Sequence, residues 1–123
     1  MSKTIIISNS NELVRMRAER IIYVQSDGNY STFVLHDKTE HVFTMNLARS
    51  MQVMEEQLGK EASSFIRIGK SLIVNRTHIF KVNVNRQQLV MSDMEVNEAF
   101  TLHASTEALR QLKTLLETLR KEA

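Results

Sequence analysis

Gly69, Lys70 and Ser71 match the end of the P-loop motif, in which a lysine contacts phosphates and a serine or threonine contacts Mg²⁺. A P-loop also needs a glycine five positions before Gly69, because its backbone must turn tightly enough to aim several N–H groups at the phosphates. That position holds Ser64, and the residues after the motif, 72–75, are a short apolar run that favours extended chain rather than the required helix. The sequence therefore argues against a phosphate-binding loop, and Lys70 must have another role.

Other enzyme chemistry would need a nucleophile with a base, or a cluster of metal ligands. The histidines do not form such a cluster, because they are scattered over expected strands and no two have the helical spacing of a zinc motif. His36 and His41 flank a turn with Asp37 and Glu40, so a surface metal clip is the alternative to ordinary surface side chains there. The chain has no cysteine and only 3 glycines, which excludes a thiolate site and a dinucleotide fingerprint. We expect no enzyme activity, no cofactor, no metal and no small-molecule ligand.

Positive charge is concentrated in one part of the chain. The net charge is only +2, but no Asp or Glu occurs from Ala62 to Ser92. The basic residues in this window are Arg67, Lys70, Arg76, Lys81 and Arg86. A local excess of this kind attracts polyanions such as nucleic acids, whereas the alternative is that solvated strand faces simply carry lysine and arginine.

Most of the chain consists of short segments rich in β-branched and aromatic residues, which are typical of strands. Asp27-Gly28-Asn29 should form a hairpin turn between two of them, because Asp-Gly supplies a positive φ. We also expect connecting turns at residues 85–87 and 92–93. The expected strands are Ile5–Ser8, Leu13–Arg17, Ile21–Ser26, Tyr30–Leu35, Glu40–Phe43, Phe65–Ile68, Ile79–Val84, Gln88–Met91 and Glu95–Leu102.

Two segments have helical spacing instead. Leu47, Met51, Met54 and Leu58 line one face of a helix that should follow an N-cap at Asn46 and end at Gly59. We interpret its methionines as core packing. Residues 105–121 predict an amphipathic C-terminal helix with Ser105 as its cap. Its leucine stripe must cover a surface of its own subunit or pair with a second copy in a homodimer.

The composition indicates one domain, 1–123, because this length and an apolar content of 42% suffice for a single core. The three isoleucines near the N-terminus are too few for a signal peptide or a membrane span. We therefore expect a cytoplasmic protein without a membrane partner.

Three parts of the chain carry a resemblance to a known family. Residues 21–26 run into Asp27-Gly28-Asn29-Tyr30, and the helix around residues 47–58 follows. The chain then reads Phe65-x-Arg67-x-x-x-Ser71-x-x-Val74-Asn75. This order resembles the LytTR-type DNA-binding domain, which is found at the output end of many bacterial response regulators, and the resemblance extends roughly from Thr4 to Leu112. The sequence contains no receiver domain, which usually precedes this module.

The resemblance implies a mainly β fold, an elongated arrangement of small antiparallel sheets with one short internal helix and a C-terminal amphipathic helix. It also implies that loops, rather than a recognition helix, contact the bases in the major groove. In this chain the implied base contacts are at Asn29, Tyr30 and Ser31, at Lys70, and at residues 103–105, which include His103.

Lys70 is the first choice for a base contact, because a lysine can donate to O6 or N7 of guanine. Phosphate contacts, which fix the register on the duplex, are expected from Arg76, Lys81, Arg86 and Arg49. Two other polar residues are assigned structural roles. Arg67 should be buried or half-buried with hydrogen bonds, and Asn75 should cap a turn.

The sequence thus predicts specific binding of double-stranded DNA by a bacterial transcription regulator, or by the output domain of a two-component response regulator. We expect two copies of the domain on repeated promoter sites. Many family members carry a histidine at the position of Gly69 and an arginine near Ala104 or Ser105, so this chain lacks two donors at the implied contacts. The alternative is a protein-interaction or dimerisation module of the same fold that has lost specific DNA contacts.

Overall fold

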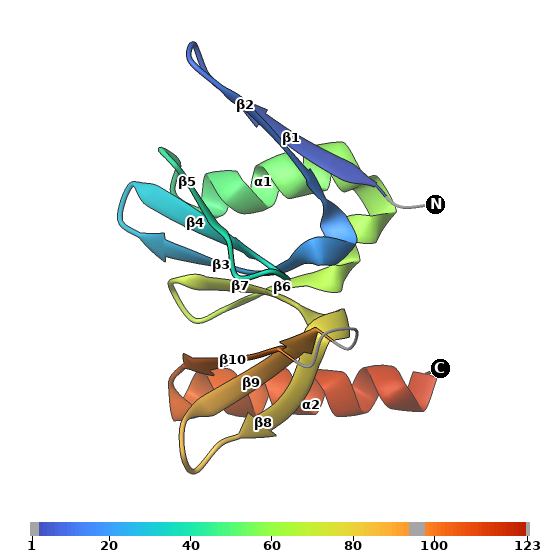
Figure 1. The fold of residues 1–123 in the computed structure, drawn as a ribbon. Helices are drawn as coiled ribbons and strands as arrows, with labels where there is room; N and C mark the ends of the chain where they lie inside the picture. The colour runs from blue at the N-terminus through green and yellow to red at the C-terminus, as the bar shows by residue number, and fades with distance from the viewer. Residues whose placement is uncertain (1–2, 94–97, 123) are drawn as a thin grey trace. The chain divides into compact units, whose positions relative to one another are not determined.

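The computed structural model describes residues 3–93 and 98–122. The chain folds into two compact units, of which the N-terminal unit extends to Thr77 and the C-terminal unit begins at His78 (Figure 1). In the described residues, the strands form antiparallel sheets of two, five and three strands.

The N-terminal unit contains the two-stranded and the five-stranded sheet. A hairpin of β1 (Thr4–Ser8) and β2 (Leu13–Arg17) forms the two-stranded sheet. The five-stranded sheet has the strand order β5-β4-β3-β7-β6, so that β3 lies at its centre. Its strands are β3 (Ile21–Asp27), β4 (Tyr30–Leu35), β5 (Glu40–Phe43), β6 (Phe65–Ile68) and β7 (Leu72–Asn75).

Helix α1 (Leu47–Leu58) begins and ends where its local sequence dictates. The Asn46 side chain accepts a hydrogen bond from the Arg49 backbone N–H at 2.8 Å, which satisfies one free donor of the first turn. Gly59 ends the helix with a positive φ of 59°. The expected N-cap and stop signal are therefore confirmed.

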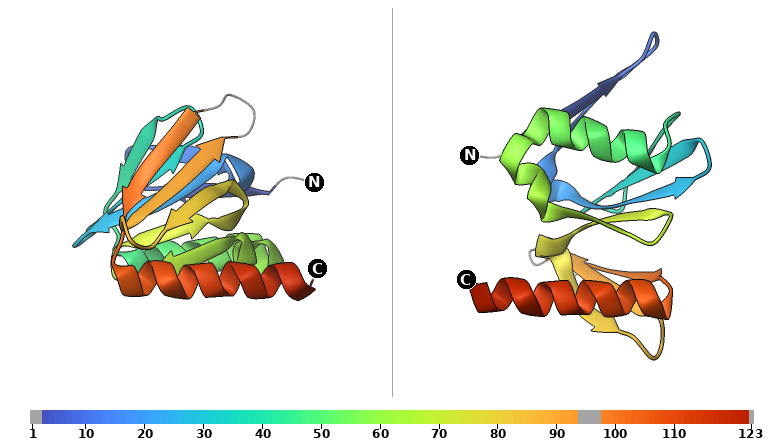
Figure 2. Two further views of the ribbon diagram at one scale, coloured as in Figure 1. Left: turned by 90° about the horizontal axis from the view of Figure 1, so that it is seen from below. Right: turned by 180° about the vertical axis from the view of Figure 1, so that it is seen from behind.

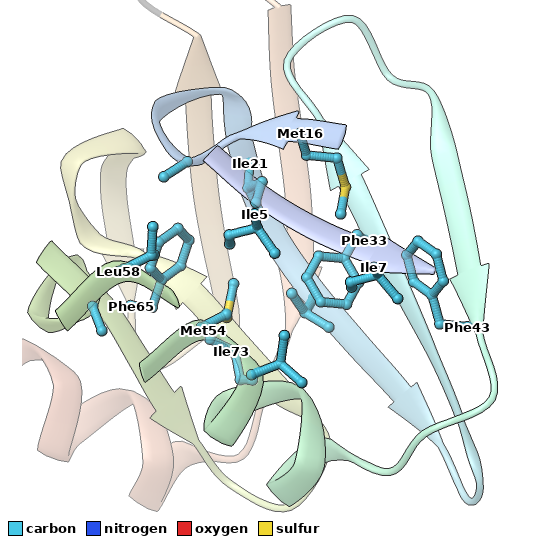
Figure 3. Packing of buried hydrophobic residues seen from close by; sticks show 14 of the residues in the cluster. Ile5, Ile7, Met16, Ile21, Phe33, Phe43, Met54, Leu58, Phe65 and Ile73 are labelled. Carbon is cyan, nitrogen blue, oxygen red and sulfur yellow. The ribbon is translucent and has the colours of Figure 1, made fainter. Parts of the chain in front are cut away.

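The core of the N-terminal unit lies between the five-stranded sheet, α1 and the β1–β2 hairpin (Figure 3). Phe33 of β4 is fully buried and meets Phe43 of β5 edge to face, with ring centroids 5.4 Å apart. Met54 of α1 is also fully buried, and Met51 packs against the same cluster. The interpretation of the methionine stripe as core packing is confirmed.

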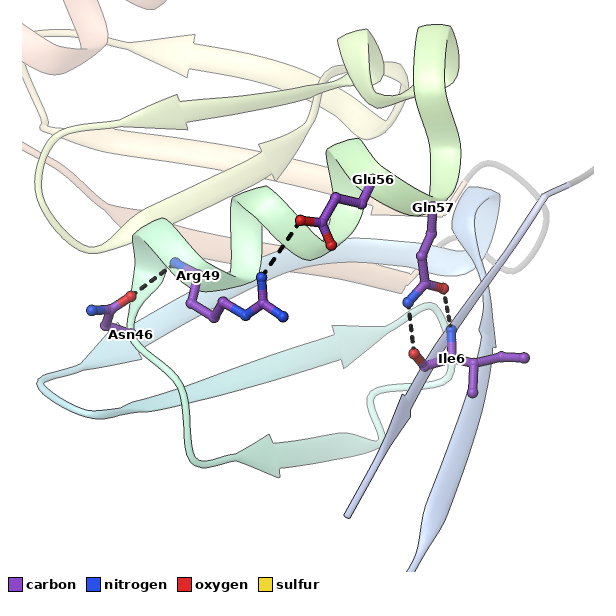
Figure 4. A network of polar contacts seen from close by, with 5 residues as sticks. All are labelled: Ile6, Asn46, Arg49, Glu56 and Gln57. Atoms are coloured by element: carbon purple, nitrogen blue, oxygen red, sulfur yellow. Dashed lines mark hydrogen bonds and ion pairs between the residues drawn. The ribbon is translucent and has the colours of Figure 1, made fainter.

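A side chain of α1 holds the edge of β1. The Gln57 amide donates to the Ile6 carbonyl at 2.8 Å and accepts from the Ile6 N–H at 2.7 Å (Figure 4). These two bonds satisfy backbone groups that the β1–β2 pairing leaves free at this residue, as a neighbouring strand would. The hairpin is thereby fixed to the helix as well as to the core.

The C-terminal unit is a three-stranded sheet with one helix. Its strands β8 (Ile79–Asn83), β9 (Gln88–Asp93) and β10 (Glu98–His103) follow the order β10-β9-β8, and α2 (Thr106–Glu122) runs along the sheet (Figure 2). The cross-strand pairs Leu89–Leu102 and Met91–Phe100 are buried. The Ser105 hydroxyl caps α2 by accepting from the Ala108 N–H at 3.1 Å, as expected.

The leucine stripe of α2 is covered along part of its length. Leu109 and Leu112 are buried within the chain, whereas Leu115 is 39% exposed. The first half of the stripe thus supports packing within the subunit.

The mainly β fold with one internal and one C-terminal helix is confirmed, but some boundaries differ from the expectation. Ser92 and Asp93 continue β9 instead of forming a turn. Residues 95–97 of the expected last strand lie outside the described residues. Short 3-10 helices, which hydrophobic periodicity does not reveal, occupy Ala18–Arg20, Gly59–Ser64 and Arg76–His78.

Candidate nucleic-acid interface

The β3–β4 turn presents Asn29 and Tyr30 to solvent. Asp27 pairs with Tyr30, so that Gly28 and Asn29 form a two-residue turn, and Gly28 has the positive φ, 62°, that such a turn requires. Tyr30 is 55% exposed even though it belongs to β4. This turn therefore offers an amide and a phenol in neighbouring positions, both able to donate and accept hydrogen bonds.

The β6–β7 turn places Lys70 at the same end of the sheet. The Ser26 N–H of β3 donates to the Ser71 carbonyl at 2.8 Å, which fixes this turn directly beside the end of β3. Gly69 again supplies a positive φ, 59°. Lys70 is exposed, and its ammonium group has no hydrogen bond or ion pair with the residues that the structure describes. We call this end of the five-stranded sheet, with Asn29, Tyr30 and Lys70, the turn end.

Ser31 does not share this exposure. It is fully buried, and its hydroxyl donates to the Met45 carbonyl at 2.8 Å. Successive residues of a strand face opposite sides, so the residue after the exposed Tyr30 must face inward. The structure thus places Ser31 inside the unit, where it joins β4 to the segment before α1.

Arg49 lies in the first turn of α1, and the Ser31–Met45 hydrogen bond sets the start of this helix beside the start of β4. Its guanidinium is 3.7 Å from the Glu56 carboxylate in a solvent-exposed ion pair (Figure 4). An exposed pair of this kind contributes little to stability, so the guanidinium can exchange Glu56 for another anion at small cost.

Asn75 and Arg76 occupy the other end of β7. The buried Asn75 amide donates to the Ile21 carbonyl at 2.9 Å and accepts from the Thr77 hydroxyl at 2.7 Å and the Thr77 N–H at 3.2 Å. The expected turn-capping role of Asn75 is confirmed. Arg76 is half-buried, and its Nε is a buried donor without a hydrogen-bond partner among the described residues.

Arg67 is not where the sequence placed it. We expected a buried or half-buried side chain, because Arg67 alternates with apolar residues on β6, but the structure leaves it exposed. Phe65 and Ile68 of the same strand are buried, so the exposure belongs to the position of Arg67 and not to β6 as a whole.

In the C-terminal unit, the β8–β9 turn and the end of β10 lie together. Asn83 accepts from the Arg86 N–H at 3.0 Å, and the Gln87 carbonyl accepts from the Ala104 N–H at 3.3 Å. His103 pairs with Gln88, so it stands beside this turn, and both Arg86 and His103 are exposed. The turn expected at residues 85–87 is confirmed, but the sequence did not reveal that Gln87 closes it with a positive φ of 54° although it carries a side chain.

Lys81 lies apart from this turn. It is exposed on β8 opposite Val90, after an irregularity in the pairing between Ile79 and Lys81. Strand β8 is an edge strand, so Lys81 lies at the edge of the three-stranded sheet.

The chain was compared with families of known proteins and with solved structures. A family model described as the LytTr DNA-binding domain matches residues 11–117. The chain belongs to this family. A solved LytTr DNA-binding domain, from a putative methyl-accepting/DNA response regulator of Bacillus cereus, has the same fold. It superposes with a TM-score of 0.60 at 16% identity and covers 93% of this chain and 96% of its own. No curated protein matches the chain.

The LytTR assignment concerns a DNA-binding fold rather than a catalytic one. Within residues 3–93 and 98–122, no three potential ligands approach closely enough to hold a metal ion. No helix in this part of the chain is long and apolar enough to cross a membrane. His36 and His41 are separated by the β4–β5 turn, whose Asp37 carboxylate accepts instead from the Thr39 hydroxyl and N–H.

Proposed function

We propose that this LytTR domain binds double-stranded DNA sequence-specifically through the turn end, as a bacterial transcription regulator or the output domain of a response regulator. One observation carries the proposal. The Ser26–Ser71 hydrogen bond sets the exposed Lys70, which has no partner among the described residues, beside the turn that presents Asn29 and Tyr30. A donor on a rigid turn next to an amide and a phenol is suited to the edges of bases in a major groove.

The roles of the other candidates follow from their positions. His103 supplies a further donor for bases on the C-terminal unit, and charge for phosphates comes from Arg86, Lys81, Arg76 and Arg49. Ser31 acts indirectly, since its bond to Met45 holds the start of β4 in place.

The proposal takes 1–123 as one functional domain that acts in the cytoplasm, with two copies on repeated promoter sites. The exposed part of the α2 stripe, with Leu115, favours a second candidate function, in which this helix mediates contact between copies. Mobility shifts with duplexes that carry one or two copies of the preferred site distinguish DNA binding from contact between copies alone. If the domain binds DNA, the duplex with two sites should show a second retarded species, whereas a module that mediates only contact between copies should retard neither duplex.

The test begins with mobility shifts of the whole chain against genomic fragments, followed by titration of the preferred duplex and a scrambled duplex at several salt concentrations. We expect Lys70→Ala to weaken binding to the preferred duplex by about 1–3 kcal/mol and to leave the scrambled duplex nearly unchanged. Arg86→Ala and Lys81→Ala should weaken both duplexes about equally and lower the salt slope by about one unit per lost contact.

Lys60→Ala is the matched control, because Lys60 is an exposed lysine of the same unit that lies outside the turn end. It should change neither duplex beyond a small effect of net charge. Equal losses on both duplexes for Lys70→Ala would assign Lys70 to a phosphate and move base recognition to Asn29, Tyr30 or His103. The absence of binding at low salt would refute the proposed function.

A further inference from the structure

A basic groove lies at the end of the five-stranded sheet opposite the turn end. Arg15 and Arg17 are alternate residues of β2, so their side chains leave the same face of the hairpin, while Met16 between them is buried. Arg20 ends the 3-10 helix that joins β2 to β3. These three arginines line a hollow of about 390 Å³, which we call the arginine groove.

The wall opposite the arginines is the β4–β5 turn, with His36 and Asp37. The His36 N–H donates to the Arg20 carbonyl at 2.9 Å, so this turn is fixed next to the 3-10 helix. The groove therefore has a defined shape, because both walls are held by backbone hydrogen bonds and the buried Met16 belongs to its lining.

The charge of the groove is not neutralised within the unit. Arg15, Arg17 and Arg20 are exposed, and their guanidinium groups have no hydrogen bond or ion pair with any described residue. Asp37 is the one acid in the lining, and its Oδ1 accepts from the Thr39 hydroxyl at 2.6 Å and the Thr39 N–H at 3.0 Å. These bonds hold the pKa of Asp37 below its usual value and direct the carboxylate into its own turn.

Three guanidinium groups that have no partner in the described part of the chain surround one hollow, and they are suited to phosphate oxygens because each can offer two parallel N–H donors. Strand β3 connects the groove with the turn end, from Ile21 to Asp27. Six residue steps at about 3.3 Å span about 20 Å, which corresponds to about six base-pair steps of 3.4 Å along a duplex. A duplex that follows this strand from Lys70 would bring its flanking phosphates to the arginines.

We propose that the arginine groove binds backbone phosphates of the DNA that flanks the sequence contacted at the turn end. This inference rests on the proposed function and adds to it a second anchoring point on the N-terminal unit. The groove contacts no bases. It therefore increases affinity without changing sequence preference, and full affinity requires a duplex long enough to reach the groove.

The test compares the whole chain with the triple variant Arg15→Gln, Arg17→Gln, Arg20→Gln on two duplexes. One duplex carries the preferred site alone, and the other adds about ten base pairs on each side, enough to cover the estimated span. We expect the unmodified chain to bind the longer duplex at least about tenfold more tightly, and the triple variant to lose this gain. Its salt slope on the longer duplex should fall by about two to three units, while the shorter duplex is bound as before.

Arg17→Gln and Lys60→Gln form a matched pair, because each removes one positive charge from an exposed position of the same unit. Only Arg17→Gln should lower the advantage of the longer duplex. Circular dichroism and thermal melting of each variant establish that it is folded, and the exposure of all four side chains predicts unchanged melting.

Inorganic phosphate supplies a second arm, measured by calorimetry on the unmodified chain and the triple variant. Tight phosphate binding that the triple variant loses, together with no effect of flank length, would overturn the assignment to DNA in favour of a small phosphorylated ligand. Equal loss on both duplexes would overturn the flanking position. Failure of the unmodified chain to bind the shorter duplex would refute the proposed function itself, and this inference with it.

Discussion

In the N-terminal unit, the turns that carry Asn29 and Lys70 contain Gly28 and Gly69, whereas the turn that carries Arg86 in the C-terminal unit is closed by Gln87. Glycine adopts a positive φ without strain, while a residue with a Cβ must be held there by its neighbours. The turn end therefore has a relaxed backbone, and the β8–β9 turn depends on bonds such as that between Ala104 and Gln87. The comparison indicates that the turns at the turn end hold their shape without backbone strain, whereas the β8–β9 turn does not.

The core of the N-terminal unit is built from more elements than the core of the C-terminal unit. Phe33 packs in a cluster to which the five-stranded sheet, α1 and the β1–β2 hairpin all contribute. Leu109 of α2 is equally buried, but it belongs to a unit of three strands and one helix. The larger core of the N-terminal unit contains more packing contacts than the core of the C-terminal unit. It also holds together the strands whose turns form the turn end.

The largest expected effect comes from the two cores. Phe33→Ala should lower the free energy of unfolding by about 3–5 kcal/mol, and Leu109→Ala by about 2–5 kcal/mol, because each leaves a cavity at a fully buried position. Urea unfolding measures these values, and amide hydrogen exchange locates them. We expect Phe33→Ala to speed exchange in β3 and β4 more than in β9 and β10, and Leu109→Ala to do the reverse. Equal acceleration throughout would mean that the units unfold as one.

The next largest expected effect is the difference in stability cost between replacing Asn75 and replacing Asn83, which both cap turns. Asn75→Ala should lower the free energy of unfolding by about 2–4 kcal/mol, because it leaves the buried Ile21 carbonyl without its donor and removes two bonds to Thr77. Asn83→Ala removes one exposed bond to the Arg86 N–H and should cost only about 0.5 kcal/mol. Thermal melts of both variants check this order. Similar costs would show that the β8–β9 turn is held as firmly as the end of β7.

The smallest effects concern the turns themselves, and their signs should be opposite. Gly28→Ala should destabilise by about 1 kcal/mol, because a Cβ strains a φ of 62° even though no atom lies within 4 Å of it. Gln87→Gly should stabilise by about 0.5 kcal/mol, since it removes the same strain but loosens the unfolded chain. Chemical denaturation resolves both shifts. A loss of stability in Gln87→Gly would mean that the neighbours of Gln87 make its conformation favourable.

Features set within a few residues could be predicted from the sequence. The bounds of α1 follow from Asn46 and Gly59, the cap of α2 from Ser105, and the hairpin at Gly28 from the demand for a positive φ. Several strand bounds, including Leu13–Arg17 and Tyr30–Leu35, also agree with the expectation. Each of these features depends on local backbone preferences and hydrogen bonds that the nearest residues themselves supply.

Features that depend on neighbours distant in sequence were decided by the tertiary structure alone. The Met45 carbonyl that accepts the Ser31 hydroxyl comes from the segment after β5, and Arg67 is exposed although Phe65 and Ile68 of the same strand are buried. The meeting of Lys70 with the Asn29 turn requires the pairing of β3 with β7, which no local pattern specifies. The sequence by itself determined the elements and the basic residues that they carry. Tertiary packing decided which of those residues are exposed together, because side-chain direction alternates along every strand and the elements packed on a sheet determine which of its faces is covered.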